Sequence, residues 1–138
     1  AELLRSLQSP QTARASIIVY ELPDNLSAEE LKDRLGPDLE AVTGLMAMFE
    51  SLGPLVARGH IPFDIYADYY RGVTAMSWKK LRRLAEAQRN EGWSNLWEWF
   101  QWLGEQMDAQ APLKNDVPAH ERFRAWRSPA DYRRLRRR

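Results

Sequence analysis

The chain has 138 residues, of which 44% are hydrophobic and 28% are charged, as is typical of one globular domain. It contains no cysteine, which excludes a disulfide framework, a thiolate metal site and a thiol nucleophile. The net charge of +1 hides an asymmetry, because residues 1–121 carry 12 basic and 18 acidic side chains, whereas residues 122–138 carry 8 basic and one acidic. We expect no membrane span, since no run approaches the roughly 20 apolar residues that a transmembrane helix needs.

Helix signals recur along the chain, and strand alternation is almost absent. Ser9-Pro10 is typical of a helix start and opens a segment that we expect to run to about Leu22. The stretch from Ser27 to Glu30 is a capping box, which starts a short helix. Gly36 is expected to end that helix.

Two interruptions are expected in the middle of the chain. Pro37 opens a helix that Gly53-Pro54 should end or kink. The Gly59 to Pro62 segment forms a second break, which is followed by a short aromatic-rich helix over residues 63–70. The clearest amphipathic pattern is predicted to be a separate helix, from Thr74 to about Arg89.

Four of the six tryptophans lie in residues 93–103, and Ser94 is expected to cap a helix in this stretch. On a helical wheel its apolar residues share one face, which predicts packing against a core. Trp97 and Trp99 flank this face, whereas Trp102 lies on the polar side and is our candidate anchor for a partner, because tryptophan is enriched at interface hot spots. The predicted core face consists of Trp93, Leu96, Phe100, Leu103 and Met107.

Together these elements predict an all-α fold. We expect a compact bundle of about five to six helices over residues 1–107, followed by a proline-containing linker over residues 108–121. Residues 122–138 then form an extended, partly helical basic tail, in which Ser128-Pro129 is a further helix start.

The tail interleaves arginine with aromatic residues, and we predict that it binds a partner. Arginine is suited to carboxylate and phosphate groups and to aromatic stacking. An acidic protein surface and anionic lipid headgroups are favoured over nucleic acid, because the rest of the chain is acidic. A solubilising terminus, or a tail that folds back on the acidic domain, is the plainer alternative. The predicted partner-binding residues of the tail are Arg122, Phe123, Arg124, Trp126, Arg127, Tyr132, Arg133, Arg134, Arg136, Arg137 and Arg138.

Residues 49–103 contain Phe49-Glu50, Arg58-Gly59, Trp78, Arg89 and the closing run LWEWFQWL, in that order. In order and spacing this stretch resembles an uncharacterised bacterial all-helical family of unknown function. Members of that family often carry a membrane helix ahead of the domain, so the resemblance implies a helical fold near a membrane. It implies no activity.

Three charged residues within the resembling stretch, Glu50, Arg89 and Glu98, occur in segments that should pack together. Arg89 projects close to the centre of the Trp78 face by helical geometry. We hypothesise a partly buried structural ionic cluster that fixes the packing of three helices. The alternative is a solvent-facing arginine at a helix end, which the helix dipole favours.

The sequence assembles no nucleophile, base and charge stabiliser, and we therefore expect no enzyme, no cofactor and no metal site. His60, with Asp64 four residues on, is the one pairing that could form an oriented base, although a polar loop residue is the plainer interpretation. Asp64 and Asp68 are one turn apart, and a single pair of carboxylates supplies too few ligands for a metal.

We therefore expect a non-catalytic helical interaction or scaffold domain. It would be an accessory subunit that docks on an acidic protein partner or membrane complex, in the cytoplasm or peripherally on the inner face of a membrane. The alternative is a small nucleic-acid-binding protein that uses the basic tail and the cluster of Lys79, Lys80, Arg82 and Arg83. Its affinity would fall steeply with added salt.

Overall fold

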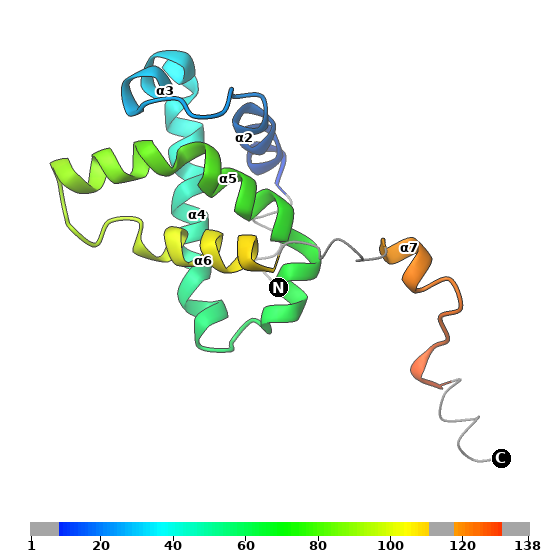
Figure 1. Cartoon of the computed structure of the whole chain (residues 1–138). Coiled ribbons are helices and arrows are strands. Elements are labelled where there is room, and N and C mark those ends of the chain that lie inside the picture. Colours follow the sequence, from blue (N-terminus) through cyan, green and yellow to red (C-terminus); the bar gives the residue numbers. More distant parts are fainter. Residues whose placement is uncertain (1–8, 111–117, 131–138) are drawn as a thin grey trace.

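The computed structural model describes residues 9–110 and 118–130, and within these residues all regular secondary structure is helical. Five α-helices have eight residues or more, and the described part of the chain contains no strand, which confirms the predicted all-α class (Figure 1). The elements are α2 (Pro10–Tyr20), α3 (Ala28–Leu35), the 3-10 helix η1 (Gly36–Asp38), α4 (Leu39–Ala57), α5 (Phe63–Glu91), α6 (Glu98–Ala109) and the short α7 (Ala119–Arg122).

The first two described helices begin at their predicted capping residues. Ser9 Oγ accepts a hydrogen bond from the backbone N–H of Thr12 at 3.1 Å and so caps α2. In α3, Ser27 Oγ accepts from the N–H of Glu30 at 3.1 Å, while the N–H of Ser27 donates to the Glu30 carboxylate at 3.3 Å. The predicted capping box is therefore confirmed, and the helix ends at Gly36, whose φ of 49° favours glycine.

The predicted helix end at Gly53-Pro54 and the predicted gap between residues 70 and 74 are wrong, whereas the predicted break from Gly59 to Pro62 is confirmed. Helix α4 continues through Gly53-Pro54 to Ala57, and residues 63–91 form one helix rather than two. Pro54 lies in the last turn of α4, where it removes one backbone hydrogen bond while Leu52 and Val56 remain buried around it. In α5, a hydrogen bond of 2.8 Å between the buried hydroxyl groups of Tyr66 and Thr74 spans the expected gap. Tertiary packing thus outweighs local propensity.

The start of the tryptophan-rich helix also differs from the prediction. Residues 94–97 form turns, so that α6 begins at Glu98 and Ser94 does not cap it. Trp93 is 78% exposed, which contradicts its predicted place on the core face. Trp97 instead is buried in a left-handed conformation, with φ of 63°, and its indole N–H donates to Gln88 Oε1 at 2.8 Å. The helical-wheel prediction fails before Glu98 because residues 93–97 are not helical.

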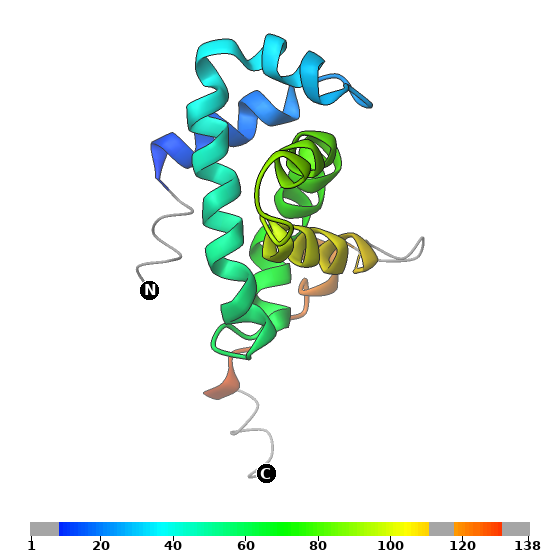
Figure 2. The ribbon, with the colours of Figure 1, turned by 90° about the vertical axis from the view of Figure 1, so that its left-hand side faces the viewer.

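The core lies where α5 and α6 cross α4, as Figures 1 and 2 show. Phe100 of α6 is fully buried, stacks on Phe49 of α4 with ring centroids 5.3 Å apart, and meets Trp78 of α5 edge-on at 5.2 Å. These contacts join three helices through one aromatic ring. Leu103 and Met107 are also buried, as predicted for this face of α6.

The continuous helical stretch from Ala28 to Ala57 is a candidate membrane span by length and composition alone, because an 18-residue window within it has a mean hydropathy of 1.3. No such segment was expected from the sequence. Val42, Met46, Phe49 and Leu52 within this stretch are fully buried against the other helices. Its apolar character is therefore also what a core helix requires.

Candidate interaction surfaces

The described part of the C-terminal tail presents two large aromatic side chains to solvent. Helix α7 begins after Pro118 and ends at Arg122, and turns follow it. Phe123 is 58% exposed and Trp126 is 60% exposed. The guanidinium group of Arg122 lies over the Phe123 ring, 5.5 Å from its centroid. Neither aromatic ring is covered by the helical core.

The same segment carries positive charges that no carboxylate balances in the part of the chain that the structure describes. Within the described residues, Arg122, Arg124 and Arg127 form no ion pair with an acidic side chain. Just before these arginines, an ion pair joins His120 Nε2 to Glu121 Oε1 at 3.8 Å and requires a protonated histidine. We call residues 122–127 the arginine-aromatic segment. The other predicted binding residues of the tail, Tyr132, Arg133, Arg134, Arg136, Arg137 and Arg138, lie outside the described residues.

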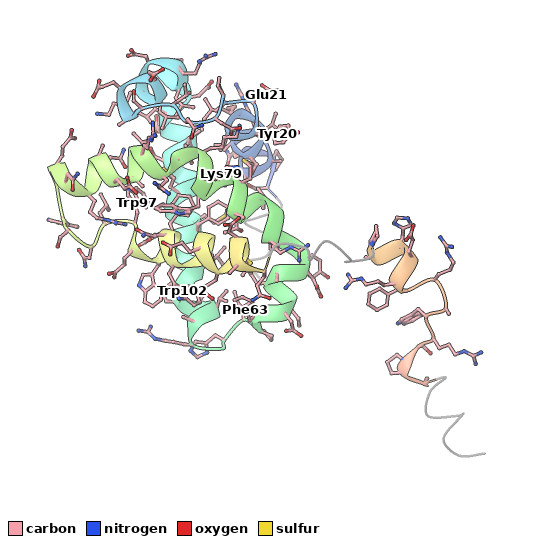
Figure 3. The ribbon with its side chains drawn as sticks, in the orientation of Figure 1. Tyr20, Glu21, Phe63, Lys79, Trp97 and Trp102 are labelled. Atoms are coloured by element: carbon pink, nitrogen blue, oxygen red, sulfur yellow. The ribbon has the colours of Figure 1, made fainter. Side chains whose placement is uncertain are left out.

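Trp102 lies on α6, outside the arginine-aromatic segment. Its side chain is half-buried and packs edge-on against Trp99, with ring centroids 6.0 Å apart. In Figure 3, Trp97 lies between α5 and α6, whereas Trp102 projects from the other side of α6. A shallow depression of about 340 Å³ lies beside Trp102. Its lining includes Arg89, Ser94, Asn95, Glu98, Gln101, Trp102 and Glu105.

Glu50 reaches the start of α6 but pairs with the backbone rather than with Arg89. Its Oε1 accepts a hydrogen bond from the N–H of Phe100 at 2.7 Å. Burial raises the pKa of the Glu50 carboxyl, while the N–H groups of Phe100 and Trp99 act in the opposite direction and the charge of Glu98 raises the pKa further. Glu50 therefore supplies the cap that Trp97, at the N-cap position, does not provide.

Arg89 likewise binds the backbone. Its Nε donates to the carbonyl of Leu96 at 2.9 Å, and its Nη2 is buried without a hydrogen-bond partner. No ion pair within 4.0 Å joins Arg89 to Glu50 or Glu98. Glu50 and Arg89 thus bind backbone groups at the 94–98 turn and the start of α6, whereas Glu98 is exposed. The charge of Arg89 lowers the pKa of Glu50 and the charge of Glu98 raises it.

Two of the four residues of the basic cluster on α5, Lys80 and Arg83, hold a loop. Lys80 donates to the carbonyl of Leu22 and pairs with Asp24 at 3.1 Å. The hydrogen bond and the charge of Lys80 lower the pKa of the Asp24 carboxyl. Arg83 Nη1 donates to the carbonyl of Asn25 at 3.1 Å. We call residues 22–26 the clamped loop, and its contacts could not be predicted from sequence patterns because they join positions 58 residues apart.

The remaining members of the cluster face solvent. Arg82 pairs with Glu86 at 3.2 Å along α5, and Lys79 is exposed (Figure 3). A second depression, of about 390 Å³, lies between this cluster, the clamped loop and α6, and its lining contains Glu105 and Asp108 as well as the cations. Its charges are therefore mixed in sign.

The pairing of His60 with Asp64 does not form in this structure. Both side chains are exposed, and Asp64 Oδ1 accepts from the backbone N–H of Ile65 at 2.9 Å rather than from the imidazole. Among the described residues, no group of three or more histidine, aspartate or glutamate side chains is placed to hold a metal ion.

No family model matches the chain, and neither the curated proteins nor the solved structures include a match to it. The resemblance of residues 49–103 to a bacterial helical family therefore stays a prediction.

Proposed function

We propose that this protein is a non-catalytic interaction domain, an accessory subunit whose arginine-aromatic segment docks on an acidic surface of a protein partner. The observation that carries the proposal is the joint exposure of Phe123 and Trp126, at 58% and 60%, among arginines with no acidic partner in the described residues. Exposed aromatic rings beside arginine are the side chains that most often anchor protein interfaces.

The chemistry of the segment favours a partner that is both acidic and partly apolar. Arg122, Arg124 and Arg127 can each bind a carboxylate in a fork, and their charges would steer the encounter. Phe123 and Trp126 would gain from being removed from water. The helical body supplies the folded support from which the segment extends. Its placement in the cytoplasm, at or near a membrane, rests on the family resemblance and the basic tail.

Nucleic acid is the alternative partner. That hypothesis used the basic cluster on α5 together with the tail. Because Lys80 and Arg83 bind the clamped loop and Arg82 pairs with Glu86, fewer cations are left to neutralise a phosphate backbone. The observations therefore favour a protein partner.

The test compares capture by the intact chain with capture by a chain that ends at Glu121, from cytosol and from detergent-solubilised membranes. The expected result is a defined protein complex that only the intact chain retains, before and after nuclease treatment. Retention of nucleic acid that nuclease or salt removes would establish the alternative. Equal capture by both chains would show that the arginine-aromatic segment is not the contact.

A further inference from the structure

We propose that the depression beside Trp102 is a binding site for the guanidinium group of an arginine in a basic segment of a partner. The site lies on α6, within the helical body, and is separate from the arginine-aromatic segment. It is therefore a second contact, which can exist whether or not the C-terminal segment docks.

The outer face of α6 supplies an aromatic side chain, Trp102, with polar groups around it. Glu98, Gln101, Trp102 and Glu105 are spaced so that they share one side of the helix, and all of them line the depression. The Trp102 ring is held edge-on against Trp99 and is half-buried. An indole ring beside a shallow depression suits a planar cation, which is attracted by the ring electrons.

The carboxylates of the depression are not balanced by the cation that lies beside them. Glu98 and Glu105 form no ion pair within the described residues, and Glu105 accepts a hydrogen bond of 2.7 Å from the neutral amide of Gln101. Arg89 also lines the depression, but its Nε is bound to the carbonyl of Leu96 and its Nη2 is buried. The two carboxylates are thus available to an incoming cation.

Arginine fits this arrangement better than a metal ion or an enclosed small molecule. Two carboxylates are too few for a dedicated metal site. The depression is shallow, at about 340 Å³, and so would receive one side chain rather than surround a whole ligand. A guanidinium group can stack on the Trp102 ring while its N–H groups reach the flanking carboxylates.

The test is a titration of the intact chain with a tetra-arginine amide peptide, followed through the indole N–H signals in NMR spectra. Trp102→Phe assigns the signal of Trp102. We expect a saturable shift of that signal, with smaller changes at the other tryptophans. Glu98→Gln with Glu105→Gln should weaken binding about fivefold to tenfold, as expected for the loss of two surface charge pairs.

Glu21→Gln with Glu40→Gln is the matched control, because it removes two exposed carboxylates that lie outside α6. It should leave the affinity within about twofold, since such distant surface charges are largely screened. Thermal melts of both double variants check that each is folded, and Trp102→Leu provides a second variant that should abolish the aromatic contact. An absent Trp102 shift, or equal weakening by the control pair, would overturn the proposal.

Discussion

The Glu50 carboxylate of α4 accepts a hydrogen bond from the N–H of Phe100 at 2.7 Å, although the two residues are 50 positions apart. The first turn of α6 would otherwise lack a side-chain cap, because Trp97 at the N-cap position provides none. One carboxylate therefore both caps a helix and joins α4 to α6, on the side of the molecule where Phe100 enters the core.

Replacement of Glu50 should show how much the cap contributes to the free energy of unfolding. Glu50→Ala is expected to lower the free energy of unfolding by about 1 to 2 kcal/mol, as for other lost N-caps. Glu50→Gln keeps an oxygen that can accept from Phe100 and should cost clearly less. Urea denaturation of both variants provides the measurement, and Glu40→Ala on an exposed position of α4 is the control. Equal losses in the alanine and glutamine variants would contradict the capping role.

The raised pKa of Glu50 predicts an unusual pH dependence. Because the folded-state pKa lies above the unfolded value, the folded protein binds more protons between the two values. The stabilisation linked to protonation of Glu50 is then fully present below the ordinary glutamate pKa and is lost as the pH rises through the raised folded value. Relative to Glu50→Gln, the unaltered chain should therefore lose stability on going from mildly acidic to neutral pH. Denaturation curves at several pH values would show the opposite trend if the carboxylate were stabilised mainly by its charge.

Gly104 permits the close approach of α6 to α5. A Cβ atom there would lie 2.3 Å from Cβ and 2.6 Å from Cγ of Trp78, which is 6% exposed. Gly104→Ala should therefore force the two helices apart and lower the free energy of unfolding by about 3 kcal/mol. Thermal and urea unfolding would reveal the loss.

Gly72→Ala is the control for this substitution, because Gly72 lies within α5 and a Cβ atom added there would meet no other atom within 4 Å. In an exposed helix interior, alanine is favoured over glycine by about 0.5 to 1 kcal/mol, so this variant should be slightly more stable than the original chain. A Gly104 variant as stable as the Gly72 variant would mean that the α5–α6 contact is not tight.

Lys80 should contribute to stability through the clamped loop. Its side chain is 14% exposed and binds both the carbonyl of Leu22 and the carboxylate of Asp24. Lys80→Met keeps most of the buried stem but removes these contacts, and we expect a loss of about 1 to 2 kcal/mol. Lys79→Met, at an exposed neighbouring position, should change stability by less than about 0.5 kcal/mol. Comparable effects in chemical denaturation would argue against the clamp.

The features predicted correctly from the sequence are those with a local cause. Ser9, the Ser27 capping box and Gly36 act on backbone groups within a few residues, and each lies where it was expected. The continuity of α5 has a non-local cause, since the buried Tyr66 and its neighbours are held by the rest of the core. The helix propensities of a short stretch of sequence do not include the contribution of tertiary packing.

The candidate binding surfaces also include features that the sequence predicted correctly and features that it did not. The exposure of Phe123 and Trp126 agrees with their place among arginines, which a core segment would not contain. By contrast, the predicted burial of Trp93 was wrong because residues 94–97 form turns instead of a helix. The partners of Glu50 and Arg89 are backbone groups from other segments, and side-chain spacing alone could not identify them.

The most direct test of the proposed docking is the affinity of the captured protein for chains that differ only in exposed aromatic residues. Phe123→Ser with Trp126→Ser leaves every charge in place, and Trp93→Ser removes an exposed tryptophan of the helical body, 78% accessible, as the control. We predict that the double variant binds at least about tenfold more weakly, as for interface hot spots, while the control binds normally. Unchanged affinity in the double variant, or an equal loss in the control, would contradict docking through the arginine-aromatic segment.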